Sequence, residues 1–254
     1  MKSSDSSQVE WIAHRGSSQL APENTLAAFR LGWQETMTCE LDIQPTGDGK
    51  LLVIHDASTK RTTGVDRQVA DCPMSELQEL DAGFQDARWK GEKLPSLEAA
   101  IAEMPVGKRL LIEIKAGPEV VPELERVIRA SGKEDQVLLQ SFDFTCCVAA
   151  RKAFPALPVY WLGVFAQDRP PGEWACFIDD RVEKARESAF DGLALNDTPL
   201  MKAADVEKIH AAGLNLAIWT VDEVGNARRL IDLGVKTIIT NRPGWLKAQL
   251  SRDE

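Results

Sequence analysis

From residue 95 onward, short apolar runs alternate with helical patterns in a regular order. Six of these runs have the character of buried strands, and they begin at Arg109, Gln136, Pro158, Gly192, Asn215 and Lys236. Helices are predicted over residues 96–103, 118–131, 144–154, 180–188, 201–212, 223–233 and 244–251. Strict alternation of strands and helices predicts a parallel sheet that is covered by helices.

Two more strand-like runs precede this region, one over residues 9–13 and one that begins at Glu40. The chain therefore offers about eight strand–helix units, which predicts a closed (β/α)8 TIM barrel. Its 254 residues suit one such barrel, so we expect a single domain over residues 1–254. An open doubly wound sheet is the alternative, although no GxGxxG motif follows the first strand.

The second unit is interrupted by a β-hairpin. Asp48-Gly49 is typical of a two-residue hairpin turn, because glycine tolerates the positive φ that such turns need. With that turn, Asp42 would lie opposite His55, although a shift of one residue is an open alternative. Glu40 and Asp42 are two residues apart on one strand, so their side chains share a face.

Residues 57–94 follow the hairpin and do not alternate cleanly. We interpret them as a small insertion or cap that selects the substrate without taking part in the chemistry, with Phe84 and Trp89 as its selecting residues. Nearer the start of the chain, Asn24 is predicted to be the N-cap of a helix that begins beside His14 and Arg15. A helix N-terminus at that place would favour an anion.

The composition limits the partners of the chain. A net charge of −9 argues against binding to nucleic acid, which requires a basic surface. No apolar stretch approaches the length of a membrane span, so no stable membrane insertion is expected. The five cysteines include no CxxC pair, and residues 1–8 are polar and do not form a signal peptide. We therefore expect free thiols in a cytoplasmic protein.

Polar residues stand where the predicted strands end, which is where the active sites of such barrels lie. Glu40, Asp42 and Glu113 would converge there, and three neighbouring carboxylates repel one another unless a cation neutralises them. An all-oxygen ligand set suits one divalent cation, Mg²⁺ or Ca²⁺, better than Zn²⁺.

The remaining charged residues at these strand ends suit a phosphate ester. Arg15 and Lys115 could hold the phosphate beside the metal. His14 and His55 could supply a general base and a general acid on opposite sides of a bond that is cleaved.

Motifs along nearly the whole chain resemble those of the glycerophosphodiester phosphodiesterase family. They are His14-Arg15-Gly16, Pro22-Glu23-Asn24-Thr25, Glu40-Leu41-Asp42, His55-Asp56, Arg61-Thr62-Thr63-Gly64, Leu94-Pro95-Ser96-Leu97-Glu98, Glu113-Ile114-Lys115, Ser141-Phe142 and Trp219-Thr220-Val221. The resemblance implies a (β/α)8 barrel with a catalytic pair at His14 and His55. It also implies metal ligands at Glu40, Asp42 and Glu113, and substrate or phosphate binding at Arg15, Lys115 and Trp219. The chain has Asn241 where the family often has aspartate, which puts any electrostatic role there in question.

The resemblance implies a cytoplasmic, metal-dependent phosphoric diester hydrolase of the bacterial type. It would cleave a small glycerophosphodiester to sn-glycerol 3-phosphate and an alcohol, as a monomer or homodimer. Two alternatives stay open. One is a lysophospholipase D or sphingomyelinase-D-like activity, which would call for an exposed apolar docking surface. The other is a barrel that binds phosphorylated ligands without turnover.

Overall fold

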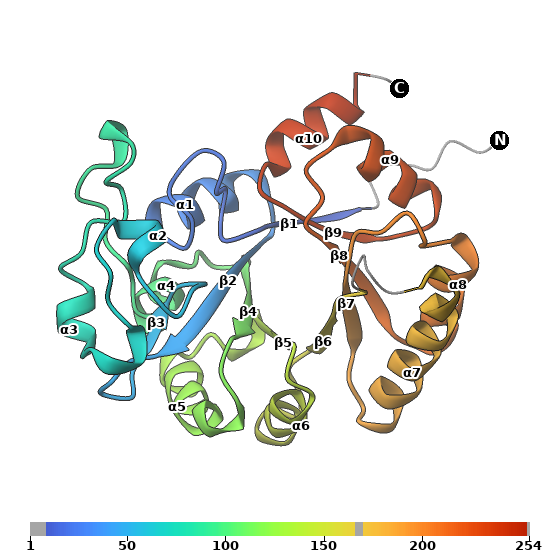
Figure 1. Cartoon of the computed structure of the whole chain (residues 1–254), viewed down its shortest axis with the longest axis horizontal. Helices are drawn as coiled ribbons and strands as arrows, with labels where there is room; N and C mark the ends of the chain where they lie inside the picture. The colour runs from blue at the N-terminus through green and yellow to red at the C-terminus, as the bar shows by residue number, and fades with distance from the viewer. Residues whose placement is uncertain (1–8, 166–169, 253–254) are drawn as a thin grey trace.

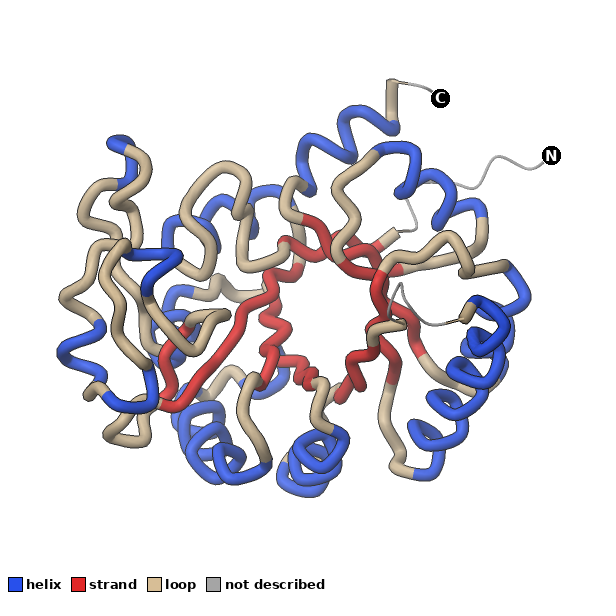
Figure 2. The backbone as a smooth tube through the Cα atoms, in the orientation of Figure 1, coloured by secondary structure: helices blue, strands red, loops and turns tan. Residues whose placement is uncertain are grey.

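The computed structural model of the chain describes residues 9–165 and 170–252, so the polar segment over residues 1–8 lies outside it. The described strands form one nine-stranded sheet in the order β1-β9-β8-β7-β6-β5-β4-β2-β3, and a pairing of β1 with β2 closes it. Every pairing is parallel except that of β2 with β3, which is the hairpin. The predicted (β/α)8 barrel is therefore confirmed, and Figure 2 shows its strands as a ring inside the helices.

The barrel strands are β1 (Glu10–Ala13), β2 (Thr38–Pro45), β4 (Arg109–Ile114), β5 (Val137–Ser141), β6 (Val159–Gly163), β7 (Gly192–Asn196), β8 (Asn215–Trp219) and β9 (Thr237–Thr240). The outer helices are α1 (Leu26–Glu35), α4 (Leu97–Glu103), α5 (Val121–Ser131), α6 (Phe144–Ala153), α7 (Trp174–Glu187), α8 (Ala203–Ala211), α9 (Val224–Asp232) and α10 (Pro243–Leu250). Figure 1 shows them around the barrel. Within the described ranges, no helix has both the length and the apolar character needed to cross a membrane.

Alternate residues of each strand face opposite sides of the barrel wall. Those that fill the barrel are mainly aliphatic: Ile12, Leu111, Leu138, Leu162, Ala194, Ala217 and Ile239. A larger buried cluster, with Leu41, Ile112 and Leu139 among its members, lies between the wall and the helices. Because Leu111 faces inward, Glu113 two residues later faces inward as well, at the carboxyl end of β4.

Helix α7 begins at Trp174, six residues before the predicted start at Asp180. Trp174, Phe177 and Ile178 are all buried, and their spacing places them on one helical face. The prediction at Asp180 was wrong because the apolar face of this helix extends further toward the N-terminus than its charged middle suggested.

The hairpin has a register one residue away from the expected one. Ile43 pairs with Val53, so Asp42 continues opposite Ile54 and not opposite His55. The backbone N–H of Ile54 donates to the carbonyl of Asp42 at 3.0 Å, which agrees with this pairing. The expected pairing of Asp42 with His55 was therefore wrong, and the alternative shift of one residue is what the structure has.

The turn explains this shift. The backbone N–H of Thr46 donates to the carbonyl of Lys50 at 2.8 Å, so three residues and not two form the loop. Gly49, the last of them, has a φ of +74°, which is typical of the glycine that follows a type I turn in three-residue hairpin loops.

The insertion follows β3 (Leu51–Val53), the second strand of the hairpin, and contains two short helices, α2 (Lys60–Thr63) and α3 (Met74–Leu77). Two 3-10 turns, η2 (Val69–Asp71) and η3 (Ala87–Trp89), complete it. Its small core packs against Leu52 and Ile54 of the hairpin and is made of Val69, Cys72, Met74, Leu77, Ala82 and Leu94. Figure 1 shows this segment at one side of the barrel, beside α1 and α4.

Helix α1 has Thr25 as its N-cap, and its hydroxyl accepts from the backbone N–H of Ala28 at 3.2 Å. The prediction that Asn24 is the cap was wrong by one residue. Asn24 has a φ of +58° and is buried, which turns its amide away from the helix and toward Asp42.

Candidate active site

The three predicted metal ligands meet inside the barrel at the carboxyl ends of β2 and β4. Asp42 stands directly opposite Glu113 in the parallel register, and Glu40 lies two residues earlier on the same face of β2. Each offers an oxygen atom that lies within 4.8 Å of the others, and all three residues are buried. This cluster could hold a metal ion through oxygen ligands alone.

Burial and mutual repulsion act strongly on these carboxyl groups. Burial, with the added repulsion of Asp42, raises the pKa of Glu113 to about 7 and raises the pKa of Glu40 well above its ordinary value. Burial also acts to raise the pKa of Asp42, but the attraction of Lys115 and Arg15 lowers it below the ordinary value. Without further positive charge, the cluster therefore shifts both glutamates toward the protonated form.

The two predicted phosphate-binding cations lie against this cluster. Lys115 Nζ is 3.0 Å from Asp42 Oδ1 and 2.5 Å from Glu113 Oε1. Arg15 Nε is 3.3 Å from Asp42 Oδ2, and the backbone N–H of Arg15 donates to Glu40 Oε2 at 2.8 Å. The three carboxylates thus have two cations beside them, which leaves the group one negative charge in excess when all are ionised.

His14 follows β1 and has a defined tautomer. Its Nδ1 lies 2.8 Å from Asn241 Oδ1. Asn241 Nδ2 donates to Asp222 Oδ2 at 2.5 Å, and because a carboxylate can only accept, the amide oxygen of Asn241 must face His14. His14 therefore carries its proton on Nδ1, which leaves Nε2 as an acceptor.

The environment of His14 also keeps the ring neutral. Burial, followed by the charge of Arg15, lowers the pKa of His14 to about 4, although the hydrogen bond to Asn241 acts in the opposite direction. A neutral imidazole with an unprotonated Nε2 can accept a proton at neutral pH.

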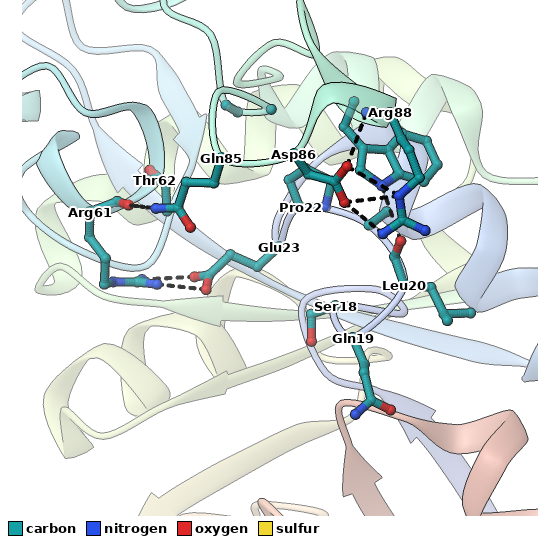
Figure 3. A pocket seen from close by; sticks show the side chains of 14 residues that line it. Ser18, Gln19, Leu20, Pro22, Glu23, Arg61, Thr62, Gln85, Asp86 and Arg88 are labelled. Atoms are coloured by element: carbon teal, nitrogen blue, oxygen red, sulfur yellow. Dashed lines mark hydrogen bonds and ion pairs between the residues drawn. The ribbon is translucent and has the colours of Figure 1, made fainter.

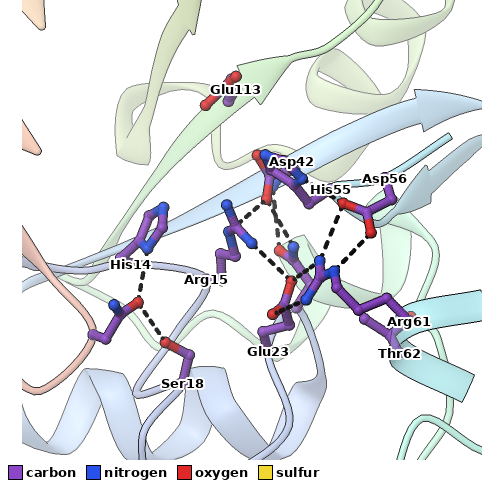
Figure 4. Close-up of polar contacts among 12 residues, drawn as sticks. His14, Arg15, Ser18, Glu23, Asp42, His55, Asp56, Arg61, Thr62 and Glu113 are labelled. Atoms are coloured by element: carbon purple, nitrogen blue, oxygen red, sulfur yellow. Dashed lines mark hydrogen bonds and ion pairs between the residues drawn. The ribbon is translucent and has the colours of Figure 1, made fainter. Parts of the chain in front are cut away.

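His55 follows the hairpin and has a carboxylate partner in its neighbour. Its Nδ1 lies 2.7 Å from Asp56 Oδ1, and Figure 4 shows the pair close to Asp42. The guanidinium of Arg61 holds the pKa of Asp56 down at about 2, so Asp56 stays ionised as an acceptor. His55 consequently donates from Nδ1 and presents Nε2 on its other side.

A cavity of about 170 Å³ opens over these groups. Its lining residues are His14, Arg15, Glu40, His55, Glu113, Lys115, Gln140, Phe142, Leu162, Trp219, Thr220 and Ile239. Asp42 lies fully buried beside it. The structure therefore brings together all eight residues that the sequence indicated.

Trp219 and Phe142 form one wall of the cavity. Their rings meet edge to face with centroids 5.6 Å apart, and Lys115 Nζ lies 5.9 Å from the centre of the Phe142 ring. Among the described residues, Trp219 Nε1 is a buried donor without a hydrogen-bond partner. This N–H is available to an oxygen atom of a ligand.

Comparison with known proteins identifies the family. Residues 14–245 match the sequence profile of the glycerophosphoryl diester phosphodiesterase family. The chain belongs to this family. It is a phosphoric diester hydrolase, as the motifs predicted.

Individual relatives agree with this membership. A glycerophosphodiester phosphodiesterase of Caldanaerobacter subterraneus is 34% identical over 243 residues, which cover 92% of this chain and 95% of the relative. One from Bacillus subtilis is 31% identical over 252 residues, which cover 91% and 83%. A phosphodiesterase of Oleispira antarctica, solved with its product sn-glycerol 3-phosphate, superposes with a TM-score of 0.84 at 26% identity, covering 95% of this chain and 96% of that one.

Enzymes of the glycerophosphoryl diester phosphodiesterase family depend on a metal, and the acidic cluster is the place where this member could hold one. Two polar residues beside the cluster, Asn24 and Gln140, were not predicted to be site residues. Asn24 Nδ2 donates to Asp42 Oδ2 at 2.8 Å, and Gln140 Nε2 lies 3.5 Å from Glu40 Oε1. The position of Gln140 at the end of β5 was the available signal.

A second cavity, of about 280 Å³, separates the β1–α1 loop of this phosphodiesterase from the insertion. Figure 3 shows the Arg61–Glu23 ion pair on one side of it and the Asp86–Arg88 pair on another. Trp89 Nε1 donates to the carbonyl of Leu20 at 3.1 Å, which ties the insertion to the loop. Trp89 therefore has a structural contact in addition to its place in the cavity lining.

Proposed function

We propose that this phosphodiesterase hydrolyses small glycerophosphodiesters, such as deacylated phospholipids, to sn-glycerol 3-phosphate and an alcohol. The observation that carries the proposal is the presence of His14 and His55 on one small cavity with two cations and an acidic cluster. The product complex of the Oleispira relative supports the same chemistry for this fold.

We assign the metal site to Glu40, Asp42 and Glu113. The residues fit a hard divalent cation, Mg²⁺ or Ca²⁺, because the donors are all oxygen and because the raised pKa values of Glu40 and Glu113 reflect their burial beside other carboxylates. When bound there, such a cation stabilises the negative charge that develops on the phosphoryl oxygens. Arg15 and Lys115 bind the phosphate, and Trp219 Nε1 donates to an oxygen of the glycerophosphate.

In the first step, the hydroxyl on the carbon next to the ester oxygen attacks phosphorus. His14 Nε2 takes the proton of that hydroxyl, and the bond from phosphorus to the leaving alcohol breaks while His55 gives a proton to the alcohol oxygen. The product of this step is a cyclic glycerol phosphate. Intramolecular attack is favoured because the hydroxyl is already held near phosphorus.

In the second step, water opens the cyclic phosphate with the two histidines in exchanged roles. His55 takes a proton from water, and His14 returns its proton to the ring oxygen, so that both residues end as they began. Replacement of either histidine by alanine should lower turnover by roughly two to four orders of magnitude, the usual effect of a positioned acid or base.

A deoxy substrate tests this route. We expect a glycerophosphocholine analogue that lacks the adjacent hydroxyl to bind with a similar KM but to react at least about a thousand-fold more slowly, because the tethered nucleophile is missing. A coupled assay for release of the alcohol measures the rate. An undiminished rate would show that water attacks directly.

The substrate class is tested by a screen over glycerophosphocholine, glycerophosphoethanolamine, glycerophosphoinositol and lysolipids. We expect release of sn-glycerol 3-phosphate from the glycerophosphodiesters. Turnover of lysolipids alone would favour the lysophospholipase D alternative.

We further propose that residues 1–254 act as one domain, as a monomer or homodimer in the cytoplasm, with residues 57–94 as a cap beside the site.

A further inference from the structure

Arg61, in helix α2 of the insertion, joins two carboxylates of the barrel mouth through all three of its guanidinium nitrogens. Its Nε and Nη2 donate to Asp56 at 2.6 and 3.1 Å. Its Nη1 and Nη2 donate to Glu23 at 2.6 and 2.8 Å. The planar fork of arginine matches two carboxylates in this way, and the ammonium group of lysine does not.

Each of these carboxylates leads to a residue of the proposed catalytic site. Asp56 Oδ1 lies 2.7 Å from His55 Nδ1, and Glu23 Oε1 accepts from Arg15 Nη1 at 2.9 Å. Figure 4 shows this continuous series from His55 through Asp56, Arg61 and Glu23 to Arg15. The series crosses from the hairpin to the β1–α1 loop by way of the insertion.

We infer that Arg61 is a positioning residue for His55: it fixes the Asp56 carboxylate, which in turn fixes the imidazole ring with Nε2 toward the leaving alcohol. Glu23 anchors the other side of the guanidinium to the β1–α1 loop. The insertion would thus contribute to the chemistry as well as to substrate selection. This inference rests on the proposed role of His55 as general acid.

The chain provides a matched control for a merely structural role. Arg67, also in the insertion, pairs with Glu76 through its Nε at 3.0 Å, and the side chains of Arg61 and Arg67 are both 48% exposed. Exposed ion pairs usually contribute little to stability. If Arg61 had only a structural role, Arg61→Ala and Arg67→Ala should therefore have similar, small effects on stability and on activity.

The test compares two substrates of the metal-loaded enzyme that differ in the leaving group. Glycerophosphocholine releases an alcohol that needs a proton, whereas glycerophospho-p-nitrophenol releases a phenolate that hardly needs one. We expect Arg61→Ala to lower the single-turnover rate of alcohol release from glycerophosphocholine by about 10- to 100-fold, the range that a misplaced catalytic group produces. The loss for the nitrophenyl ester should be only a few-fold, and Arg67→Ala should match the wild type on both.

One further variant and two further measurements separate positioning from charge and from folding. Arg61→Lys keeps the charge but loses the fork, so we expect it to show the same dependence on the leaving group as Arg61→Ala. Added guanidinium ion should restore part of the glycerophosphocholine activity of Arg61→Ala. The melting temperature of both Arg61 variants should stay close to that of Arg67→Ala.

A double variant distinguishes failure of this inference from failure of the proposed function. If Arg61 acts through His55, Arg61→Ala should add no further loss in a His55→Ala background. An additive loss, an equal loss on both substrates, or no loss from Arg61→Ala alone would overturn the inference. If His55→Ala itself slows the single-turnover release of both leaving groups equally, the assignment of His55 as general acid is wrong instead.

Discussion

The amide oxygen of Asn241 accepts a hydrogen bond from His14 Nδ1 at 2.8 Å, across 227 residues of sequence. Asp222 fixes the orientation of this amide through its other end, and Ser18 Oγ donates to the same oxygen at 2.9 Å. A neutral amide thus sets the tautomer of the proposed base without adding a charge beside it. This is the structural role of Asn241 in this chain.

Substitution of Asn241 by Asp should therefore change the pH dependence of catalysis. A carboxylate opposite Nδ1 stabilises the protonated imidazole and raises the pKa of His14 from its depressed value of about 4. Because a base acts only when unprotonated, the acid limb of kcat/KM should move to higher pH. The profile is measured at saturating metal, with Asn241→Ala as the control that removes the acceptor; coincident profiles for wild type and N241D would contradict this role.

Metal binding should stabilise the protein more strongly as the pH rises. The raised pKa of Glu113, about 7, means that the metal-free native state holds a proton that the unfolded chain loses near pH 4.5. The contribution of this bound proton to the free energy of unfolding is fully present below about pH 4.5 and is lost as the pH rises through about 7. A bound cation removes this loss. At a thousand-fold excess over its Kd, it also adds about 4 kcal/mol to the free energy of unfolding.

Thermal melts with metal and with chelator, from pH 5 to pH 8, measure this difference. The gap in Tm between the two conditions should widen with pH, and Glu113→Gln should narrow it by removing the titrating ligand. Comparing the two conditions at each pH also cancels the opposite contribution of His14, whose lowered pKa increases stability as the pH rises from about 4 to 6.5. A constant gap, or full activity after exhaustive chelation, would contradict the metal assignment.

Substitution of Asn24 by Gly should weaken metal binding while it preserves the local backbone. Glycine accepts the φ of +58° at this position, so the change isolates the amide that donates to Asp42 Oδ2. Loss of a group that orients a metal ligand typically lowers affinity about 10- to 100-fold. Calorimetric titration with Mg²⁺ or Ca²⁺ measures this metal affinity. An unchanged Kd would mean that Asp42 is oriented by Arg15 and Lys115 alone.

Changes at the insertion should alter the order of preferred leaving alcohols. Phe84 is 45% exposed, so Phe84→Ala should change kcat/KM unequally among glycerophosphodiesters with little effect on folding. Trp89→Phe keeps most of the ring but removes the hydrogen bond to Leu20 that joins insertion and loop. If each variant changed kcat/KM by the same factor for every substrate, these residues would not select the alcohol.

The sequence by itself determined the barrel and indicated the polar residues that meet at the carboxyl ends of its strands. Alternation of strands and helices predicted the (β/α)8 fold, since a parallel sheet needs a helix between successive strands. The two-residue period within a strand placed Glu40 and Asp42 on one face, and the barrel topology brought Glu113 beside them at the same level. The residue periods of strands and helices are local patterns, whereas the meeting of Glu113 with Glu40 and Asp42 follows from the barrel that their alternation predicts.

The tertiary structure decided how those residues are held. The contact of Asn24 with Asp42, that of His14 with Asn241 and that of Arg61 with Glu23 join segments that are distant in sequence. No local periodicity encodes such pairs, because they depend on which loops meet at the barrel mouth. The register of the hairpin was decided within the hairpin itself, where the hydrogen bond between Thr46 and Lys50 closes a three-residue loop and places Ile54, not His55, opposite Asp42.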